Sequence, residues 1–473
     1  MKRLSSLVIS RNHLFFVFLV AGYIFDVLLY DFMGFTAADE LMALFLIPFA
    51  GLVVYERRNT RELLPLLVVG AVFAFYTGYS LLIRSNVWQA VLKDLLIQIK
   101  PFLGFFCTYL IAPSFTAQQK RFVVMMCLAT SLLMLYVGLS GSIFYYFGHE
   151  SYFAKTMVAT TFLCLYCCSD RWEDLAILLL ILSIGLFSTR AKFYGFWGIT
   201  CFLLLLYKTG FFNPSGRDTL LNGTRCATQQ DEIRYSTGRD ALLNGTRCAT
   251  QQDEIRYSTG RDTLLSETSS ATRRVKGTDR FWLGLTGILF AVCGLCLILW
   301  LGKDKLMLYY IDGMVNSREM WSRPAILLTA LSVFTDYIPF GSGLASFASF
   351  VSGEYYSPIY AKYGIDHLWG ISRENYAYIA DAYYPVLAQF GFVGLGLYLY
   401  FWIWVVRKSL RLKAAGYAKE AVLVWLSVIF FAIEGVADAT FTHNRGFFIL
   451  LVTAMTLAKC RNESCKKAEE KIS

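Results

Sequence analysis

Long apolar runs recur along nearly the whole chain, and they constrain its fold more than any other feature. Each run holds roughly 17 to 25 mostly apolar residues, enough for an α-helix to cross about 30 Å of hydrocarbon. Because a bilayer offers no water to backbone groups, and the runs lack the alternation of a membrane barrel, the spans should be α-helices. Composition agrees, since 56% of the 473 residues are hydrophobic and 16% are charged. The sequence therefore predicts an all-α integral membrane protein.

The hydropathy pattern predicts about twelve transmembrane helices. Their centres are expected near Val20, Pro48, Val69, Phe105, Leu133, Phe162, Leu180, Phe202, Phe290, Leu395, Val428 and Leu451. The first run lacks a small-residue cleavage site after a short core, so it is expected to be a retained span. Transmembrane helices 1 to 8 are expected in residues 1–210, followed by a cytoplasmic loop at 211–280 and a ninth helix at 281–302. An external loop is expected at 303–381. Three more helices at 382–459 and a basic tail at 460–473 complete the predicted organisation.

The distribution of basic residues predicts the orientation. With the N-terminus in the cytoplasm, roughly 31 of the 44 Lys and Arg residues lie inside and about 13 lie outside. The net charge of +10 is therefore a property of the loops and does not indicate nucleic-acid binding. Both termini are expected inside, whereas Arg190 and the loop from about Lys303 to Asp381 open on the outer face.

Neither a tandem repeat in the chain nor its cysteine and histidine residues are expected to belong to the active site. A 22-residue unit repeats between Gly216 and Thr259 and offers few apolar residues, so it is expected to be a polar linker, with a partner-docking module as the alternative. Its "NGT" sequons at Asn222 and Asn244 fall on the predicted inner side. The two CxxC spacings lie within apolar runs, and four histidines make a multi-histidine site improbable, so no metal is expected.

A pair of cations interrupts the apolar pattern. Arg190 and Lys192, in "STRAKFYGF", lie between two apolar runs, where charge is costly. They either contact an anionic ligand or extend to lipid head groups.

The outer loop is long and rich in aromatic residues. "RPAILLTALSVF" has helical spacing, and "PFGSG" is typical of a tight turn, in which Gly341 and Gly343 adopt positive φ or place their amides near phosphate. The loop is expected to pack onto the helices as a lid. Its aromatic side chains suit either a membrane interface or stacking on sugar rings. They are Tyr355, Tyr356, Tyr360, Tyr363, Trp369, Tyr376 and Tyr378.

The order of several motifs resembles a known group of enzymes. "STRAK" precedes a span, and "RPAILLTAL…DYIPFGSGLASF", "YSPIYAKYG" and "DAYYPVLAQFGFVGLG" follow in that order. Over residues 175–400, apart from the repeat, this resembles the O-antigen ligase and Wzy-type polysaccharide polymerase superfamily, most of all the repeat-unit polymerases. The resemblance implies a GT-C-like glycosyltransferase of the bacterial inner membrane, without metal or cofactor, whose active site faces the periplasm. It also implies a glycan donor and acceptor linked to undecaprenyl diphosphate, with a chain-length regulator as a further possible partner.

The resemblance assigns roles to particular residues. Arg190 matches the first arginine of these enzymes and Arg323 matches the arginine that opens the loop helix, with Lys192 and Arg318 nearby. All four are expected to bind the diphosphate, because fixed cations stabilise the charge that develops on such a leaving group.

A base is needed to remove the proton from the attacking hydroxyl. Asp381 lies where related ligases carry a histidine, a departure that favours polymerase over ligase, although it can instead cap a helix starting at Ala382. His367 is the second candidate for the base. Glu434 and Asp438 are candidates for acceptor contact, or pair with Arg445. A ligase acting on lipid A core or protein, and a flippase for polyprenol-linked glycans, remain the alternative functions.

Overall fold

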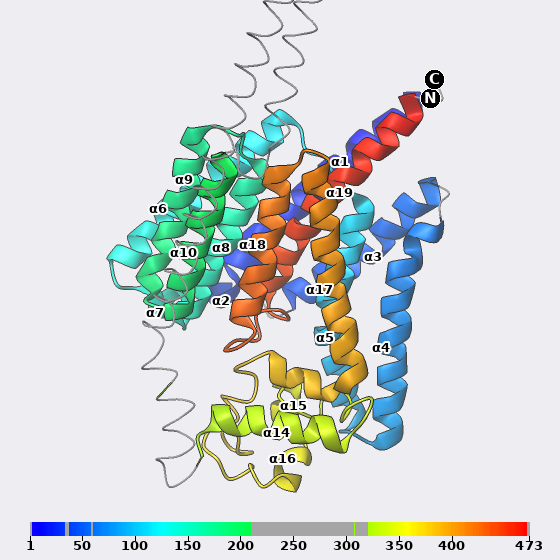
Figure 1. Cartoon of the computed structure of the whole chain (residues 1–473), viewed down its shortest axis with the longest axis vertical. Coiled ribbons are helices and arrows are strands. Elements are labelled where there is room, and N and C mark those ends of the chain that lie inside the picture. The colour runs from blue at the N-terminus through cyan, green and yellow to red at the C-terminus, as the bar shows by residue number, and fades with distance from the viewer. Residues whose placement is uncertain (1, 34–36, 58–59, 210–306, 308–319, 471–473) are drawn as a thin grey trace, which may run out of the picture. The chain divides into compact units, whose positions relative to one another are not determined.

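The computed structural model describes residues 2–33, 37–57, 60–209, 307 and 320–470 (Figure 1). The chain divides into two units, one of Met1–Cys201 with Leu295–Ser473 and one of Phe202–Gly294, and only residues 202–209 of the second are described. Within the described ranges every regular element is a helix. The all-α prediction is therefore confirmed there, while the tandem repeat and the predicted span near Phe290 lie outside the described residues.

The first half of the chain forms a series of helices. They are α1 (Lys2–Gly22), η1 (Tyr23–Leu28, π-helical), α2 (Tyr30–Met33), α3 (Ala38–Arg57), η2 (Thr60–Leu63), α4 (Leu64–Ile83), α5 (Trp88–Ile111), α6 (Ala117–Leu139), α7 (Ile143–Phe147), α8 (Glu150–Cys167), α9 (Trp172–Ile184), η3 (Gly185–Ser188) and α10 (Ala191–Lys208). In the described part of the chain, five stretches are long and apolar enough to cross a membrane, namely Arg11–Leu28 and the helices α3, α4, α5 and α6.

The second half contributes a loop region and three long helices. They are α14 (Ser322–Asp336), α15 (Phe350–Glu354), α16 (Ile359–Lys362), η5 (Tyr384–Gln389), α17 (Gly391–Ala414), α18 (Ala418–Glu434) and α19 (Asn444–Glu470). Apart from Phe290, each predicted span centre lies within a helix of the structure. The total of twelve spans stays a prediction.

Two helices form the centre of the larger unit. Almost every side chain of α8 is buried, and so are those of α19 from Arg445 to Ala458. α19 packs against α5, α8 and α18, and α8 also contacts α6 and α9 (Figure 1). Because protein surrounds these two helices, they tolerate threonines and charged residues that a lipid-facing helix would not.

Contacts at the ends of the helices fall into two groups. In the first group, Tyr79 Oη donates to Gly341 O at 2.9 Å, Ser85 Oγ donates to Leu344 O at 2.8 Å, and Asn444 Nδ2 donates to Asp26 O at 2.5 Å. In the second group, Arg57 donates to Leu110 O at 3.0 Å. The grouping is the one that alternating spans require, and the position of the first group on the outside stays a prediction from the charge distribution.

The loop region is anchored on the helices by buried polar contacts. The Ala345 N–H donates to Asp94 Oδ2 of α5 at 2.7 Å, and the Leu344 N–H donates to Ser80 Oγ of α4 at 2.7 Å. Gly341 and Gly343 have φ of +79° and +85°, as the turn prediction required. Their amides donate to Tyr337 O and Gln389 O, so the alternative role of these amides in phosphate binding is wrong.

Candidate functional site

Four charged side chains, three on helices and one on the connection between α18 and α19, meet at the corner between these two helices. Lys192 Nζ of α10 lies 2.7 Å from Glu434 Oε2, at the end of α18, and 3.6 Å from Asp438 Oδ2. Lys155 Nζ of α8 lies 2.6 Å from Asp438 Oδ1. Two cations and two carboxylates therefore form one nearly buried cluster, which we call the corner cluster.

Hydroxyl groups complete the corner cluster. Thr440 Oγ1 lies 3.1 Å from both Glu434 Oε2 and Asp438 Oδ1, so its one proton is shared between the two carboxylates, and Ser151 Oγ donates to Asp438 Oδ2 at 3.0 Å. Burial acts to raise the pKa of Asp438, but the positive charges of Lys155 and Lys192 outweigh it and hold that pKa well below its usual value. Asp438 is therefore a carboxylate at neutral pH and cannot act as an acid there.

The alternative pairing of Glu434 and Asp438 with Arg445 is wrong. The Arg445 guanidinium pairs with Asp31 of α2, and its Nε donates to Thr156 Oγ1 of α8 at 2.7 Å. Arg445 is 1% exposed, so it fixes the start of α19 against α8 and α2. Glu434 and Asp438 pair instead with Lys192 of α10 and Lys155 of α8, two helices that face this corner.

Arg190 lies beside the start of α8. Its guanidinium contacts His149 Nε2 at 2.8 Å and Glu150 Oε2 at 3.1 Å. Thr189, just before it, has φ of +53°, which turns the chain between η3 and α10. Burial and then the charge of Arg190 lower the pKa of His149, so this ring is neutral at pH 7 and can accept from the guanidinium. Because the Arg190 guanidinium contacts His149 and Glu150, it is not simply extended toward lipid head groups.

Arg323 and Asp381 form the second charged pair of the site. Arg323 Nε donates to Asp381 Oδ2, and both side chains are partly exposed. Asp381 does not cap a helix, because η5 begins at Tyr384 with Tyr383 as its N-cap, so that alternative is wrong. Burial raises the pKa of Asp381 despite the opposing effect of Arg323. A raised pKa makes this carboxylate a better proton acceptor than a solvated aspartate.

Backbone contacts join this pair to the corner cluster. The N–H groups of Tyr383 and Tyr384 both donate to Gly435 O, at 3.0 and 3.3 Å, so the chain after Asp381 is fixed to the corner after α18. A small cavity of about 70 Å³ has Arg323, Asp381 and Ala437 in its wall. The structure thus brings Arg323 and Asp381 near the loop that carries Asp438, and the charges of Asp438 and Lys192 also act on the pKa of Asp381.

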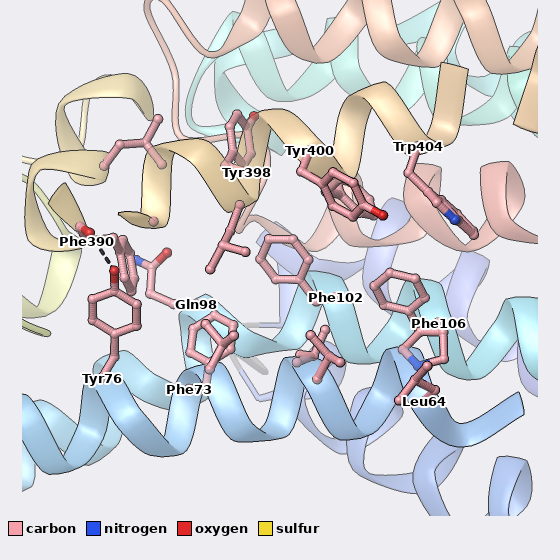
Figure 2. A pocket seen from close by; sticks show the side chains of 18 of the residues that line it. Leu64, Phe73, Tyr76, Gln98, Phe102, Phe106, Phe390, Tyr398, Tyr400 and Trp404 are labelled. Carbon is pink, nitrogen blue, oxygen red and sulfur yellow. Dashed lines mark hydrogen bonds between the residues drawn. The ribbon is translucent and has the colours of Figure 1, made fainter. Parts of the chain in front are cut away.

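An apolar groove lies between α4, α5 and α17 (Figure 2). Its volume is about 290 Å³, and it extends from Leu64 and Trp404 to Tyr76 and Phe390. The Tyr76 hydroxyl donates to Phe390 O at 2.6 Å, which closes one end (Figure 2). The 12 residue steps from Leu64 to Tyr76 correspond to about 18 Å of helix, more than half of a hydrocarbon core. Tyr383, two residues after Asp381, also lines the groove.

The remaining predicted residues are placed as follows. His367 is exposed in the loop between α16 and η5, and the structure gives it no role in the corner cluster. Arg318 lies outside the described residues. Among the described residues, no group of three or more His, Cys, Asp and Glu side chains is arranged to hold a metal ion.

The sequence reasoning missed Lys155, His149 and Glu150. Lys155 had a usable signal, because it interrupts the apolar run "SYFAKTMVATTF" as Arg190 interrupts its own. His149 and Glu150 lack such a signal, since they lie in a polar connection whose neighbours only the fold reveals.

No protein-family model matches the chain, and no curated protein matches it. Its function is therefore argued from the site.

Proposed function

We propose that the chain is a metal-independent glycosyltransferase of the bacterial inner membrane. It would polymerise undecaprenyl-diphosphate-linked repeat units into O-antigen, capsule or exopolysaccharide on the periplasmic face, with a GT-C-like fold and no cofactor. The observation that carries the proposal is the Arg323 and Asp381 pair, which lies next to the corner cluster at the end of the helices where the large loop packs. A flippase would instead be expected to place such charges at mid-membrane on broken helices.

The donor would be held by the apolar groove and the cations. A polyprenyl chain suits the groove of Figure 2, because the groove is apolar, faces α4, which is largely exposed, and extends along the helices. Its wall includes Tyr383, so the lipid's head group would come close to Asp381. Arg323 then offers a forked donor to the diphosphate oxygens, and Lys192 adds a point charge.

Each cation of the site has a carboxylate partner, and this shapes the mechanism. Arg323 pairs with Asp381, Arg190 with Glu150, and the lysines with Glu434 and Asp438. An incoming diphosphate must therefore compete with a carboxylate for the guanidinium. Protonation of Asp381 removes that competitor from Arg323, because a neutral carboxyl no longer holds the cation by charge.

The proposed step uses this coupling. Asp381 accepts the proton of the acceptor hydroxyl as the oxygen bonds to the anomeric carbon of the donor. The bond from that carbon to the diphosphate oxygen breaks, and its electron pair stays on the diphosphate. Arg323 loses the charge of Asp381 at the moment at which the diphosphate gains charge, so its donors transfer to the leaving group.

Purified protein that lengthens lipid-linked oligosaccharide in detergent would test the proposal most directly. Arg190→Ala should abolish long chains while the protein stays in the membrane, because Arg190 lies at the same end as Lys192 and is predicted to bind the diphosphate. Arg373→Ala is the matched control, since Arg373 is exposed and outside the site. Normal chain length in Arg190→Ala, or purified protein without lengthening activity, would count against the proposal.

A ligase is separated from a polymerase by a deletion strain. Loss of a polymerase leaves single repeat units on the final acceptor, whereas loss of a ligase leaves no polymer there. The flippase alternative is excluded if the detergent assay, which contains no membrane to cross, shows lengthening.

A further inference from the structure

A second hollow adjoins the Arg323 and Asp381 pair, and its walls are aromatic. Its volume is about 470 Å³, within the range of about 300–1,000 Å³ that small ligands fill. Trp321, Trp369 and Tyr378 line it, together with Ser322 and Arg323. Because Arg323 and Tyr378 also line the small cavity whose wall includes Asp381, the hollow is adjacent to the proposed reacting centre.

The aromatic walls are held in place by the surrounding chain. Gly370 has φ of +82°, and a Cβ there would lie 2.2 Å from a ring carbon of Tyr378, so the ring packs directly on this glycine. The Tyr378 N–H donates to Gly370 O at 2.9 Å, and Ser322 Oγ donates to Trp369 O. The rings of Trp369 and Tyr378 stand 5.0 Å apart at 66°, which makes a corner with two faces.

Trp369 presents its ring to the hollow and to solvent. It is 69% exposed, and Met320, Trp321 and Leu368 line the hollow beside it. Ser322 and Arg323 supply the polar part of the same lining. An exposed indole fixed in position offers its face to a molecule that has both apolar and polar surfaces.

Other aromatic residues of the loop are used for its structure. Tyr360 is fully buried, and its hydroxyl accepts from the Ala348 N–H at 2.9 Å. Tyr356 donates to Ile371 O at 2.9 Å, and Tyr363 donates to Asp336 Oδ2 at 2.7 Å. Sugar contact is therefore excluded for Tyr360, and the described aromatic residues that face a common hollow beside Arg323 are Trp321, Trp369 and Tyr378.

We propose that this hollow binds a pyranose ring of the glycan, with the ring's C–H face against Trp369 and its hydroxyls directed to Arg323. This inference rests on the proposed function and identifies where the sugar part of a lipid-linked substrate lies. The apolar groove holds the lipid, the charged pair holds the diphosphate, and the aromatic hollow holds a sugar, so a substrate of this class has one place for each of its chemical parts.

The test is the binding of a free glycan to the full-length protein in detergent. The probe is oligosaccharide released by mild acid from the polyprenyl-linked glycans of the producing cell, and saturation-transfer NMR reports its contacts. Trp369→Ala should weaken binding about tenfold, in line with the loss of an aromatic contact, whereas Trp369→Phe should keep most of it. Tyr145→Ala is the control, because Tyr145 on α7 is also a strongly exposed aromatic residue and lies outside the hollow.

The outcomes separate the two proposals. Equal binding by wild type and Trp369→Ala overturns the sugar site, and so does an absence of glycan binding in protein that lengthens lipid-linked chains. Protein that binds the glycan through Trp369 but does not lengthen any chain keeps the sugar site and overturns the polymerase. Loss of binding in Tyr145→Ala as well would show a non-specific effect and would also overturn the site.

Discussion

At the scale of single residues, the sequence indicates which charged residues need a partner better than it predicts who that partner is. Arg190 and Lys192 stand out in the sequence because charge between apolar runs is costly, and Asp381 stands out from the family resemblance; each lies in a charged contact of the structure. The same argument could have found Lys155. The partners could not be predicted, because Glu434 is 242 residues from Lys192 and only the packing of α10 on α18 brings them together.

Removing Lys155 should destabilise the protein strongly. Lys155→Met leaves Asp438 with the more distant Lys192 as its only lysine partner, and breaking a buried pair costs about 3–5 kcal/mol. Thermal and denaturant unfolding in detergent would measure this. Asp438→Asn in the same chain should recover part of the loss, because it removes the uncompensated charge.

The control is an exposed pair at the same end of the helices. Lys93 Nζ lies 2.6 Å from Glu354 Oε2, with both side chains partly exposed. Lys93→Met should therefore cost only about 0–1 kcal/mol. If both lysine variants lose the same stability, burial of the corner cluster does not carry the energy assigned to it.

Protonation of Asp381 should cause the loss of activity at low pH. If Asp381 is the base, activity falls as the pH drops and the carboxylate takes up a proton. Since burial raises its pKa, this fall should occur above the pH of about 3.9 expected for a solvated aspartate. The dependence of kcat/KM on pH would show it, and Asp381→Asn should lower the rate by about 100-fold or more. An Asp381→Asn enzyme with the wild-type rate would assign the base elsewhere.

At the scale of elements, hydropathy detects lipid-facing helices more readily than buried ones. α4 is long and apolar enough to cross a membrane and is largely exposed, whereas α8 and α19, which form the centre, are not among the five described stretches with that property. α8 carries Lys155 and three threonines, which lower its hydropathy but have partners inside the protein. The sequence therefore predicted where helices lie, but the helix that is central could only be recognised from packing.

The close approach of two backbone segments is the element-scale feature most open to test. A Cβ on Gly341 would lie 2.3 Å from Gly391 N and 2.4 Å from Ala388 O, and neither backbone atom can move without shifting η5 or α17. Gly341→Ala should therefore loosen the loop from the helices, seen as a lower unfolding temperature and faster limited proteolysis between α14 and η5.

Gly364 provides the matched comparison. It has φ of +65°, similar to Gly341, but a Cβ there meets no atom within 4 Å. Gly364→Ala should show only the strain of the left-handed backbone, about 1–2 kcal/mol. Gly341→Ala should cost more than that by the clash, typically a further 1–3 kcal/mol. Equal losses at the two sites would mean that backbone strain, and not contact between segments, sets the cost.

At the scale of the whole molecule, the contacts at the helix ends agree with long helices that cross the membrane in alternating directions. The loop contacts place Asn12 with Ser114 in one group and Ser85 with Leu344 in the other, and they agree with a chain that crosses the membrane at each long helix. The sequence could predict this, because basic residues gather in alternate loops. It could not predict which loops touch, since hydropathy carries no information about neighbours.

The orientation itself gives the last prediction. Cysteine substitutions at Ser140 and Glu374 should react with a membrane-impermeant maleimide in intact cells, because both positions are exposed and belong to the predicted outer group. Substitutions at Gln118 and Ala415, which are equally exposed but belong to the inner group, should react only after permeabilisation. The unmodified chain, with its own cysteines, supplies the background. Labelling of Glu374→Cys only in permeabilised cells would put the Arg323 and Asp381 pair in the cytoplasm, where a glycan already carried across the membrane could not reach it.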